Sequence, residues 1–225
     1  MTDALISYLE NIITPERKQL FDSVIQNRTR YITLVLEDIF QPHNASAVLR
    51  SCDCFGIQDV HIIENKNKYR VNPDVTLGSD KWLSLIKYNK QENNTIKAIK
   101  ELRLKGYRIV ATSPHKNDKD LKNFDLSQGK IALFFGTELR GLSDDVIQNA
   151  DEFLKIPMYG FTESYNISVS AAIILYTLSE KMKASAIKWQ LTKEEMKEVK
   201  KNWLERSIRN SNLIEKEYFN NKNRK

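Results

Sequence analysis

The chain has 225 residues, of which 41% are hydrophobic and 28% are charged. This length suits one α/β domain with terminal helices, or at most two small domains, and the composition excludes a largely disordered chain. The formal net charge of +6, from 35 Lys and Arg against 29 Asp and Glu, suits a polyanionic partner without requiring one.

Segments with helical spacing of apolar residues alternate with segments rich in β-branched and aromatic residues. In chain order, the first half predicts a helical stretch over 3–27 that breaks at Pro15, a strand over 31–36, a helix over 42–55 that ends at Gly56, a strand over 60–63, a loop over 64–82 and a strand over 84–88. The second half predicts a helix over 94–105, strands over 107–111 and 131–135, a helix over 143–149, a strand over 153–156, helices over 166–183 and 192–210, and a frayed end over 220–225. This alternation predicts an α/β fold with a mainly parallel sheet flanked by helices.

The sequence lacks the features of membrane, secreted and metal-binding proteins. No run of about 18 apolar residues exists, and the start of the chain lacks the basic and apolar regions of a signal peptide. Cys52 and Cys54 are badly placed to bridge each other, and three scattered histidines offer no zinc spacing. We therefore expect a reduced, cytoplasmic protein without a bound metal.

Three polar segments lie beside predicted strand ends, where ligands of α/β proteins bind. They are Asn44–Arg50 (NASAVLR), Phe135–Ser143 (FGTELRGLS) and Ile156–Ala172, a loop that leads into a helix through Ser and Asn. No G-x-G-x-x-G motif or P-loop occurs, so a nucleotide-type cofactor would bind without a phosphate-binding glycine turn. Taken singly, the segments are also typical of a surface arginine, a plain turn and a capped core helix.

Taken together and in this order, the three segments resemble the motifs of the SpoU/TrmH branch of the SPOUT methyltransferases. The resemblance runs from about Arg17 to Lys183, and it includes LVLEDIFQPHN at 34–44 and GSDKW at 78–82. It implies a deep trefoil knot over about residues 131–183 and homodimers that pack through the knot, with sites built from both chains.

The same resemblance implies a division of the chain into three parts. These are a basic helical extension over 1–28, a SPOUT methyltransferase domain over 29–185 and a basic helical tail over 186–225.

The activity that the resemblance implies is transfer of a methyl group from S-adenosylmethionine to a ribose 2′-oxygen. The expected substrate is tRNA, with guanosine 18 of the D-loop as the acceptor. Ribosomal RNA is the alternative substrate, and a non-catalytic RNA-binding or ribosome-assembly factor is the alternative of another class.

The resemblance also implies roles for individual residues. Expected cofactor contacts are Thr112, Gly136, Glu138, Ile156, Met158, Tyr165 and Asn166. Expected catalytic residues are Arg50, Asn44, Glu138, Ser164 and Asn166. Arg50 would activate or orient the 2′-oxygen, with or without help from an RNA phosphate, and Asn44 would hold Arg50 or the ribose. Glu138 and Asn166 would shape the site, and Ser164 would help to place the substrate phosphate or the loop.

Basic residues toward both ends are expected to contact RNA phosphates, which position an RNA without reading its sequence. The expected contacts are Arg17, Lys18, Arg28, Arg30, Lys181 and Lys183, followed in the tail by Lys197, Lys200, Lys201, Arg206 and Arg209. A solvated helix face is the alternative interpretation of the tail. Glu180 and Met182 stand where tRNA enzymes of this branch carry an Arg pair, and Tyr165 replaces a leucine, so the family pattern is incomplete here.

Overall fold

The computed structural model describes residues 2–70, 72–113, 119–138 and 140–223. The chain divides into two compact units, one of Thr29–Trp189 and one of Met1–Arg28 with Gln190–Lys225. The larger unit carries the three polar segments, so it holds the candidate site.

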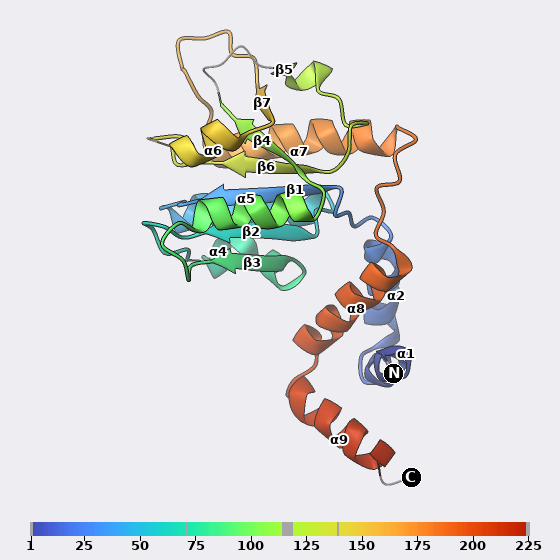
Figure 1. The fold of residues 1–225 in the computed structure, drawn as a ribbon. Helices are drawn as coiled ribbons and strands as arrows, with labels where there is room; N and C mark the ends of the chain where they lie inside the picture. The colour runs from blue at the N-terminus through green and yellow to red at the C-terminus, as the bar shows by residue number, and fades with distance from the viewer. Residues whose placement is uncertain (1, 71, 114–118, 139, 224–225) are drawn as a thin grey trace. The chain divides into compact units, whose positions relative to one another are not determined.

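A seven-stranded sheet forms the centre of the larger unit, in the order β3-β2-β1-β6-β4-β7-β5 (Figure 1). The strands are β1 (Ile32–Glu37), β2 (Asp59–Ile63), β3 (Ser84–Tyr88), β4 (Arg108–Thr112), β5 (Lys119–Asp120), β6 (Ile131–Phe135) and β7 (Glu152–Lys155). All neighbouring strands run parallel, and Leu34 of β1 pairs with Val60 of β2 and Leu133 of β6. The predicted α/β class with a parallel sheet is therefore confirmed.

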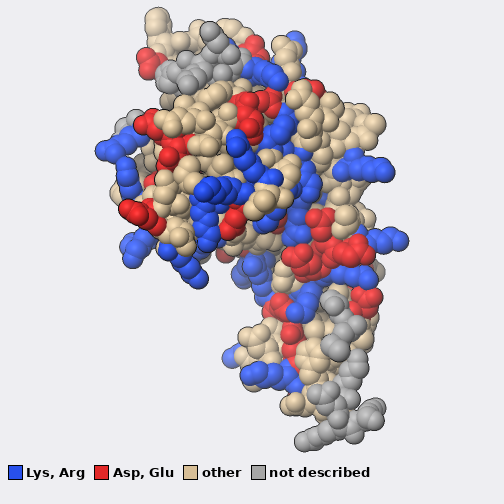
Figure 2. Space-filling model, viewed as in Figure 1, with Lys and Arg blue, Asp and Glu red and all other residues tan. Residues whose placement is uncertain are grey.

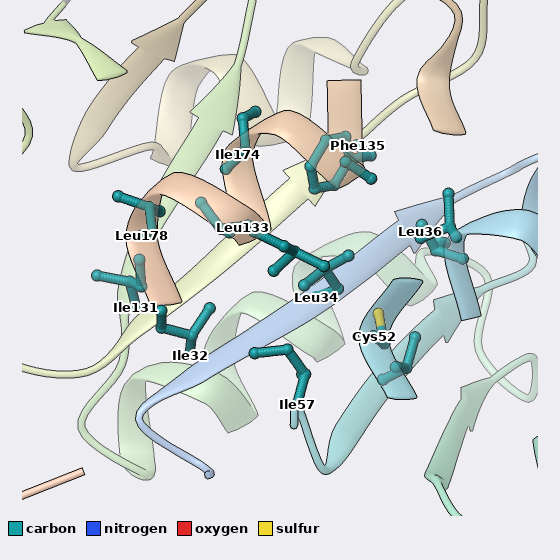
Figure 3. Packing of buried hydrophobic residues seen from close by; sticks show 14 of the residues in the cluster. Ile32, Leu34, Leu36, Cys52, Ile57, Ile131, Leu133, Phe135, Ile174 and Leu178 are labelled. Carbon is teal, nitrogen blue, oxygen red and sulfur yellow. The ribbon is translucent and has the colours of Figure 1, made fainter. Parts of the chain in front are cut away.

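Helices cover both faces of this sheet, as a parallel sheet requires. On one face, α3 (Pro42–Cys54) and α7 (Ile167–Lys183) share a hydrophobic cluster with β1 and β6. On the other face, α5 (Asn94–Leu104) and α6 (Asp144–Asn149) bury the alternate strand residues. Figure 3 shows Ile174 and Leu178 of α7 facing Ile131 and Leu133 of β6. Each such fully buried side chain stabilises the fold by about 1.5–3 kcal/mol.

Local sequence signals explain where the helices begin and end. Gly56 and Gly106, with φ of 78° and 80°, follow α3 and α5 in the left-handed conformation that glycine adopts without strain. Ser143 and Asn166 cap α6 and α7, since their side chains accept hydrogen bonds from backbone N–H groups of the first turn. These ends match the predicted boundaries to within a few residues.

Several predicted segments differ from the structure. The predicted loop over 64–82 contains α4 (Pro73–Thr76) and the 3-10 turn η1 (Ser79–Lys81), while β5 and the turn η2 (Leu121–Asn123) follow β4. The frayed end predicted over 220–225 was wrong for the residues described, because α9 (Ser211–Asn223) continues to Asn223. A packing contact between Tyr218 and Tyr8, with ring centroids 4.9 Å apart, helps to order α9.

The smaller unit consists of helices from both ends of the chain. α1 (Thr2–Glu10) and α2 (Pro15–Ile25) pack against α8 (Lys193–Ser207), which a capping box of Thr192 and Glu195 starts. Phe21 and Trp203, with ring centroids 5.4 Å apart, lie in the shared apolar core. Residues from the two termini thus complete one helical unit.

Candidate active site

The three polar segments meet where the parallel strands end. Asn44 lies in the first turn of α3 after β1, Glu138 lies in the loop after β6, and Asn166 is the N-cap of α7 after β7. Because parallel strands finish at the same edge of a sheet, these loops converge although they are far apart in the sequence.

A hydrogen-bonded network joins Asn44, Glu138 and Asn166. Oε1 of Glu138 accepts hydrogen bonds from Nδ2 of Asn44 at 2.8 Å and from Nδ2 of Asn166 at 2.7 Å. Nδ2 of Asn166 also lies 3.2 Å from Oδ1 of Asn44, and Gln41 accepts from Asn44 at 3.0 Å. Asn44 is only 5% exposed, so its amide serves to connect the segments, and the carboxylate makes these bonds stronger than neutral ones.

The loop after β6 is a tight turn that depends on its glycines. Thr137 and Gly141 exchange two backbone hydrogen bonds of 2.9 Å, which fold the segment back on itself. A Cβ atom on Gly136 would lie 2.1 Å from the carbonyl oxygen of Gly141, so only glycine fits there. Glycine is therefore needed at position 136 because the chain approaches itself closely there. The resemblance to the family had implied a cofactor contact at this residue instead.

A pocket of about 350 Å³ opens beside this loop. Thr112, Gly136, Glu138, Ile156, Met158 and Tyr165, six of the seven predicted cofactor contacts, line it together with Ser164. Asn166, the seventh, lies beside the pocket through its bond to Glu138. Phe135, Leu154 and Ile174 supply apolar walls, so the cavity combines apolar surface with a few polar groups, as small-molecule sites do.

Arg50 is the predicted catalytic residue that the structure brings neither to this pocket nor into the network around Glu138. It lies exposed on α3 and is absent from the described residues that line the pocket. Six residues separate Arg50 from Asn44, which puts the two about 120° apart around the helix axis. Within the described part of the chain, the Arg50 guanidinium has no hydrogen bond or ion pair.

A second pocket, of about 440 Å³, adjoins the first and was not anticipated from the sequence. The two share the loop after β6, including Thr137, Glu138 and Arg140. Its other wall is the connection between β1 and α3, which contributes Asp38 and Phe40. Phe40, an aromatic residue in a polar stretch just before Pro42, was the feature of the sequence that could have indicated this pocket.

Two carboxylates, those of Glu37 and Asp38, connect the segments around this second pocket by hydrogen bonds. Glu37 accepts hydrogen bonds from the hydroxyls of Thr95 at 2.6 Å and Ser143 at 2.7 Å, and from the Ser143 backbone N–H at 2.9 Å. Oδ1 of Asp38 accepts from three successive backbone N–H groups of residues 65–67, at 2.7, 2.8 and 3.3 Å. Asp38 has φ of 52°, a conformation uncommon outside glycine and tolerated best by Asn and Asp.

The predicted RNA contacts fall into two groups. Four already bind other residues of the chain. Arg28 is 2% exposed, with its guanidinium over the Trp203 ring, and Lys181 donates hydrogen bonds of 2.9 Å to the carbonyls of Lys122 and Phe124. Lys18 forms an ion pair with Glu10 at 2.8 Å, and Arg30 forms one with Asp59 at 3.0 Å. Arg17 and Lys183 are exposed, and their charged groups make no ion pair with the described residues. Burial removes Arg28 from the surface on which a phosphate contact could form.

The lysines of α8 are also paired within the smaller unit. Lys197 pairs with Asp3 at 2.9 Å, Lys200 with Glu10 and Asp22, and Lys201 with Glu205 at 2.7 Å. Although burial opposes it, hydrogen bonds to Asp22 and Glu10 raise the pKa of Lys200 above its ordinary value. Figure 2 shows acidic and basic side chains interspersed over these helices.

Two further kinds of feature are absent from the described part of the chain. No cluster of three or more His, Cys, Asp and Glu side chains among the described residues could hold a metal ion. No described helix is both long enough and apolar enough to cross a bilayer.

A parallel sheet with a ligand-sized pocket at its strand ends defines an α/β protein of the kind that binds a small cofactor or substrate there. Residues 31–176 match the SpoU rRNA Methylase family, and a tRNA (guanosine(18)-2'-O)-methyltransferase of Borreliella burgdorferi strain B31 is 46% identical over 93% of this chain and 94% of its own. The chain therefore belongs to the SpoU methylase family.

Solved structures show the same architecture. The A. aeolicus TrmH/SpoU tRNA modifying enzyme superposes with a TM-score of 0.76 at 28% identity, covering 86% of this chain and 98% of that chain. The SpoU methyltransferase AviRb from Streptomyces viridochromogenes, solved with AdoMet, has a TM-score of 0.60 at 21% identity over 72% and 65% of the two chains, which shows a shared fold.

Proposed function

We propose that this protein methylates the ribose 2′-oxygen of guanosine 18 in tRNA, with S-adenosylmethionine as the methyl donor. The observation that carries the proposal is the 46% identity to a tRNA (guanosine(18)-2'-O)-methyltransferase over 93% of the chain. That span reaches beyond the 31–176 family segment into the terminal helices, so it favours a tRNA over a ribosomal substrate.

The first pocket fits the cofactor on chemical grounds. Its apolar walls from Phe135, Leu154 and Ile174 suit an adenine ring, and the carboxylate of Glu138 suits a ligand that carries positive charge. S-adenosylmethionine has no phosphate, so the missing glycine-rich phosphate turn is no obstacle. When bound, the cofactor supplies the electrophilic methyl group of its sulfonium.

The network of Asn44, Glu138 and Asn166 positions the loops around the reacting atoms in this proposal. Each loop comes from a different strand, so the bonds between them fix the distance between cofactor and acceptor. Ser164, at the pocket wall, would place the loop or the substrate phosphate. The 2′-hydroxyl must lose its proton as its oxygen bonds to the methyl carbon, and neither amide of the network can accept that proton.

Arg50 is assigned to the acceptor oxygen, and its position supports a homodimer. A guanidinium keeps its proton, so Arg50 would orient the 2′-oxygen and stabilise its developing charge, with an RNA phosphate taking part in the proton transfer. Because Arg50 lies outside the pocket of its own chain, a second copy would have to present it. Val169, Ile173 and Tyr176 form a partly exposed apolar stripe on α7 that suits such an interface.

The fold proposal includes the trefoil knot over about residues 131–183. Strand β4 lies between β6 and β7, which supports a chain path in which the segment after β6 passes back across an earlier strand.

Arg17 and Lys183 remain the favoured RNA contacts of the predicted set, because their charges are exposed and unpaired among the described residues.

Methylation of matched tRNA transcripts tests the function. A transcript with guanosine at position 18 should accept one labelled methyl group, whereas the same transcript with 2′-deoxyguanosine 18 should accept none, since the acceptor oxygen is missing. Labelling of ribosomal RNA alone would support the alternative substrate. Binding of tRNA without methyl transfer to any RNA would support a non-catalytic RNA-binding factor.

A further inference from the structure

The second pocket lies where the acceptor nucleoside must sit if the first pocket holds the methyl donor. The two cavities share Thr137, Glu138 and Arg140, so a ligand in one borders a ligand in the other. A volume of about 440 Å³ is ample for a purine nucleoside. This step rests on the proposed function.

Phe40 gives this pocket an aromatic surface that the fold itself does not use. It is 74% exposed, whereas its neighbour Ile39 is 8% exposed and belongs to the core. Single-stranded and flipped RNA bases are recognised by stacking on exposed aromatic rings. Phe40 lines this pocket two residues before α3 begins, so its exposed ring is suited to that task.

Asp38 gives the same pocket a carboxylate with a fixed orientation. Three backbone N–H groups hold its Oδ1, and no described residue bonds to its Oδ2. Guanine presents two neighbouring donors, N1–H and N2–H, on its Watson–Crick edge, whereas adenine presents no such pair. A carboxylate oxygen that accepts hydrogen bonds therefore favours guanine.

We infer that the second pocket is the acceptor-base site, in which Phe40 stacks on the guanine and Asp38 accepts hydrogen bonds from its N1–H and N2–H. Phe40 and Asp38 are then specificity-determining residues. Lys66 and Arg140, which also line the pocket, place positive charge where the phosphates of the acceptor nucleotide would lie.

The stacking role is tested with a series at Phe40. Loss of one stacked base predicts a kcat/KM for tRNA reduced about tenfold to a hundredfold in Phe40→Ala and Phe40→Leu, with Phe40→Trp near wild type. Melting temperature and S-adenosylhomocysteine binding should not change, because Phe40 is exposed. Leu104→Ala, which alters an exposed apolar side chain on α5, is the control. Full activity of Phe40→Leu would overturn stacking, since leucine keeps apolar area without a ring.

A binding readout separates this inference from the methyltransferase proposal. The added indole of Phe40→Trp should be quenched by tRNA carrying guanosine 18, but far less by the same tRNA with an abasic site at position 18. This signal needs no methyl transfer. Equal quenching by both RNAs would rule out base stacking even if the protein methylates tRNA, and selective quenching would support it even if methylation failed.

The recognition of guanine by Asp38 is tested with a double-mutant cycle. One change is Asp38→Asn in the protein, and the other replaces guanosine 18 of the tRNA by inosine, which lacks the N2 amino group. Asparagine can still accept the three backbone bonds and tolerates the left-handed conformation. Each single change should lower tRNA affinity about tenfold, and the two together should cost little more than either alone. Fully additive losses would show that Asp38 does not contact the N2 group.

Discussion

At the scale of single residues, the site is organised by one carboxylate. Glu138 is exposed at the strand ends, and its Oε1 gathers the amides of Asn44 and Asn166 from two other loops. An amide can donate and accept at once, so each asparagine bonds both to the carboxylate and to a further group. The arrangement therefore depends on charge as well as on shape.

The substitution Asn44→Asp should disrupt this network through charge. The introduced aspartate would place a second carboxylate against Glu138, so the unfolding free energy should fall by about 1–3 kcal/mol at pH 7.5. The repulsion raises the folded-state pKa of one carboxyl above its unfolded value, so the native state gains a proton first and the loss should shrink toward pH 5. Urea unfolding at both pH values measures this.

The uncharged variant Asn44→Ala is the matched control. It removes the same hydrogen bonds without adding a charge, so its deficit should stay constant across that pH range. An identical pH response of the two variants would contradict the electrostatic explanation.

Gly136 is the second residue whose replacement has a defined cost. In Gly136→Ala the new methyl group would lie 2.1 Å from the Gly141 carbonyl oxygen, so the backbone of the loop must shift. We expect a loss of about 1–3 kcal/mol in unfolding free energy and weaker S-adenosylhomocysteine binding, measured by urea unfolding and calorimetry. Gly160→Ala, whose Cβ would meet nothing within 4 Å, should leave stability unchanged. Normal cofactor binding by Gly136→Ala would show that the pocket does not need this turn.

At the scale of elements, β2 carries a titratable side chain in the interior of the sheet. His61 is buried, and its Nδ1 lies 3.1 Å from the hydroxyl of Tyr88 on β3. Burial, with a smaller effect from the charge of Lys105, lowers the pKa of His61 to about 3. The folded state therefore favours the neutral imidazole over the charged form.

This buried histidine predicts a pH-dependent stability. Its folded-state pKa lies below its unfolded value of 6.5, so the unfolded chain takes up the proton first as the pH falls. The contribution is complete above pH 6.5 and decreases by about 1.4 kcal/mol per pH unit below it. Urea unfolding from pH 7.5 to 4.5 should show a smaller slope for His61→Gln than for wild type, and equal slopes would contradict this assignment.

Because α8 packs against α1 and α2, deleting the C-terminal helices does not by itself test whether they bind RNA. A chain that ends near Lys183 loses Trp203, which packs on Phe21 and lies under the guanidinium of Arg28. Such a truncation uncovers the apolar core of the smaller unit as well as removing positive charge. Substitution of Arg17 or Lys183 by Ala is a cleaner test of RNA contact, because neither charge is used in folding contacts among the described residues.

At the scale of the whole molecule, the proposed dimer makes a prediction about Arg50. Arg50→Ala and Glu138→Ala should each inactivate a homodimer, one at the acceptor oxygen and one at the pocket. In a heterodimer of the two variants, one site would combine an intact pocket with an intact Arg50 from the partner, so about half of the wild-type activity should return.

Two affinity tags allow that heterodimer to be purified and assayed. No recovered activity would mean that Arg50 acts within its own chain. Light scattering on the wild type provides the control, since a monomer would contradict the dimer outright.

Local signals in the amino-acid sequence were enough to predict the parallel α/β class and the helix ends, whereas the resemblance of three ordered motifs predicted the family. These signals are apolar spacing, capping residues such as Ser143 and Asn166, and left-handed glycines, all of which act over a few residues. The motif resemblance also predicted seven of the residues that line the first pocket, six as cofactor contacts and Ser164 as a catalytic residue. They lie together because the motifs follow strands, and the ends of parallel strands share one edge of the sheet.

Only the tertiary structure shows which charged and polar side chains already bind other residues of the protein. The burial of Arg28 over Trp203, the bonds from Lys181 to two carbonyls and the paired lysines of α8 join residues far apart in the chain, which no local pattern reveals. The exposure of Phe40 beside a second pocket depends in the same way on where the strands place their loops. Arg50 lies outside its own pocket because the turn of α3 directs it away from the side of Asn44. Composition counts charges and rings, but folding determines which of them remain free to meet a ligand.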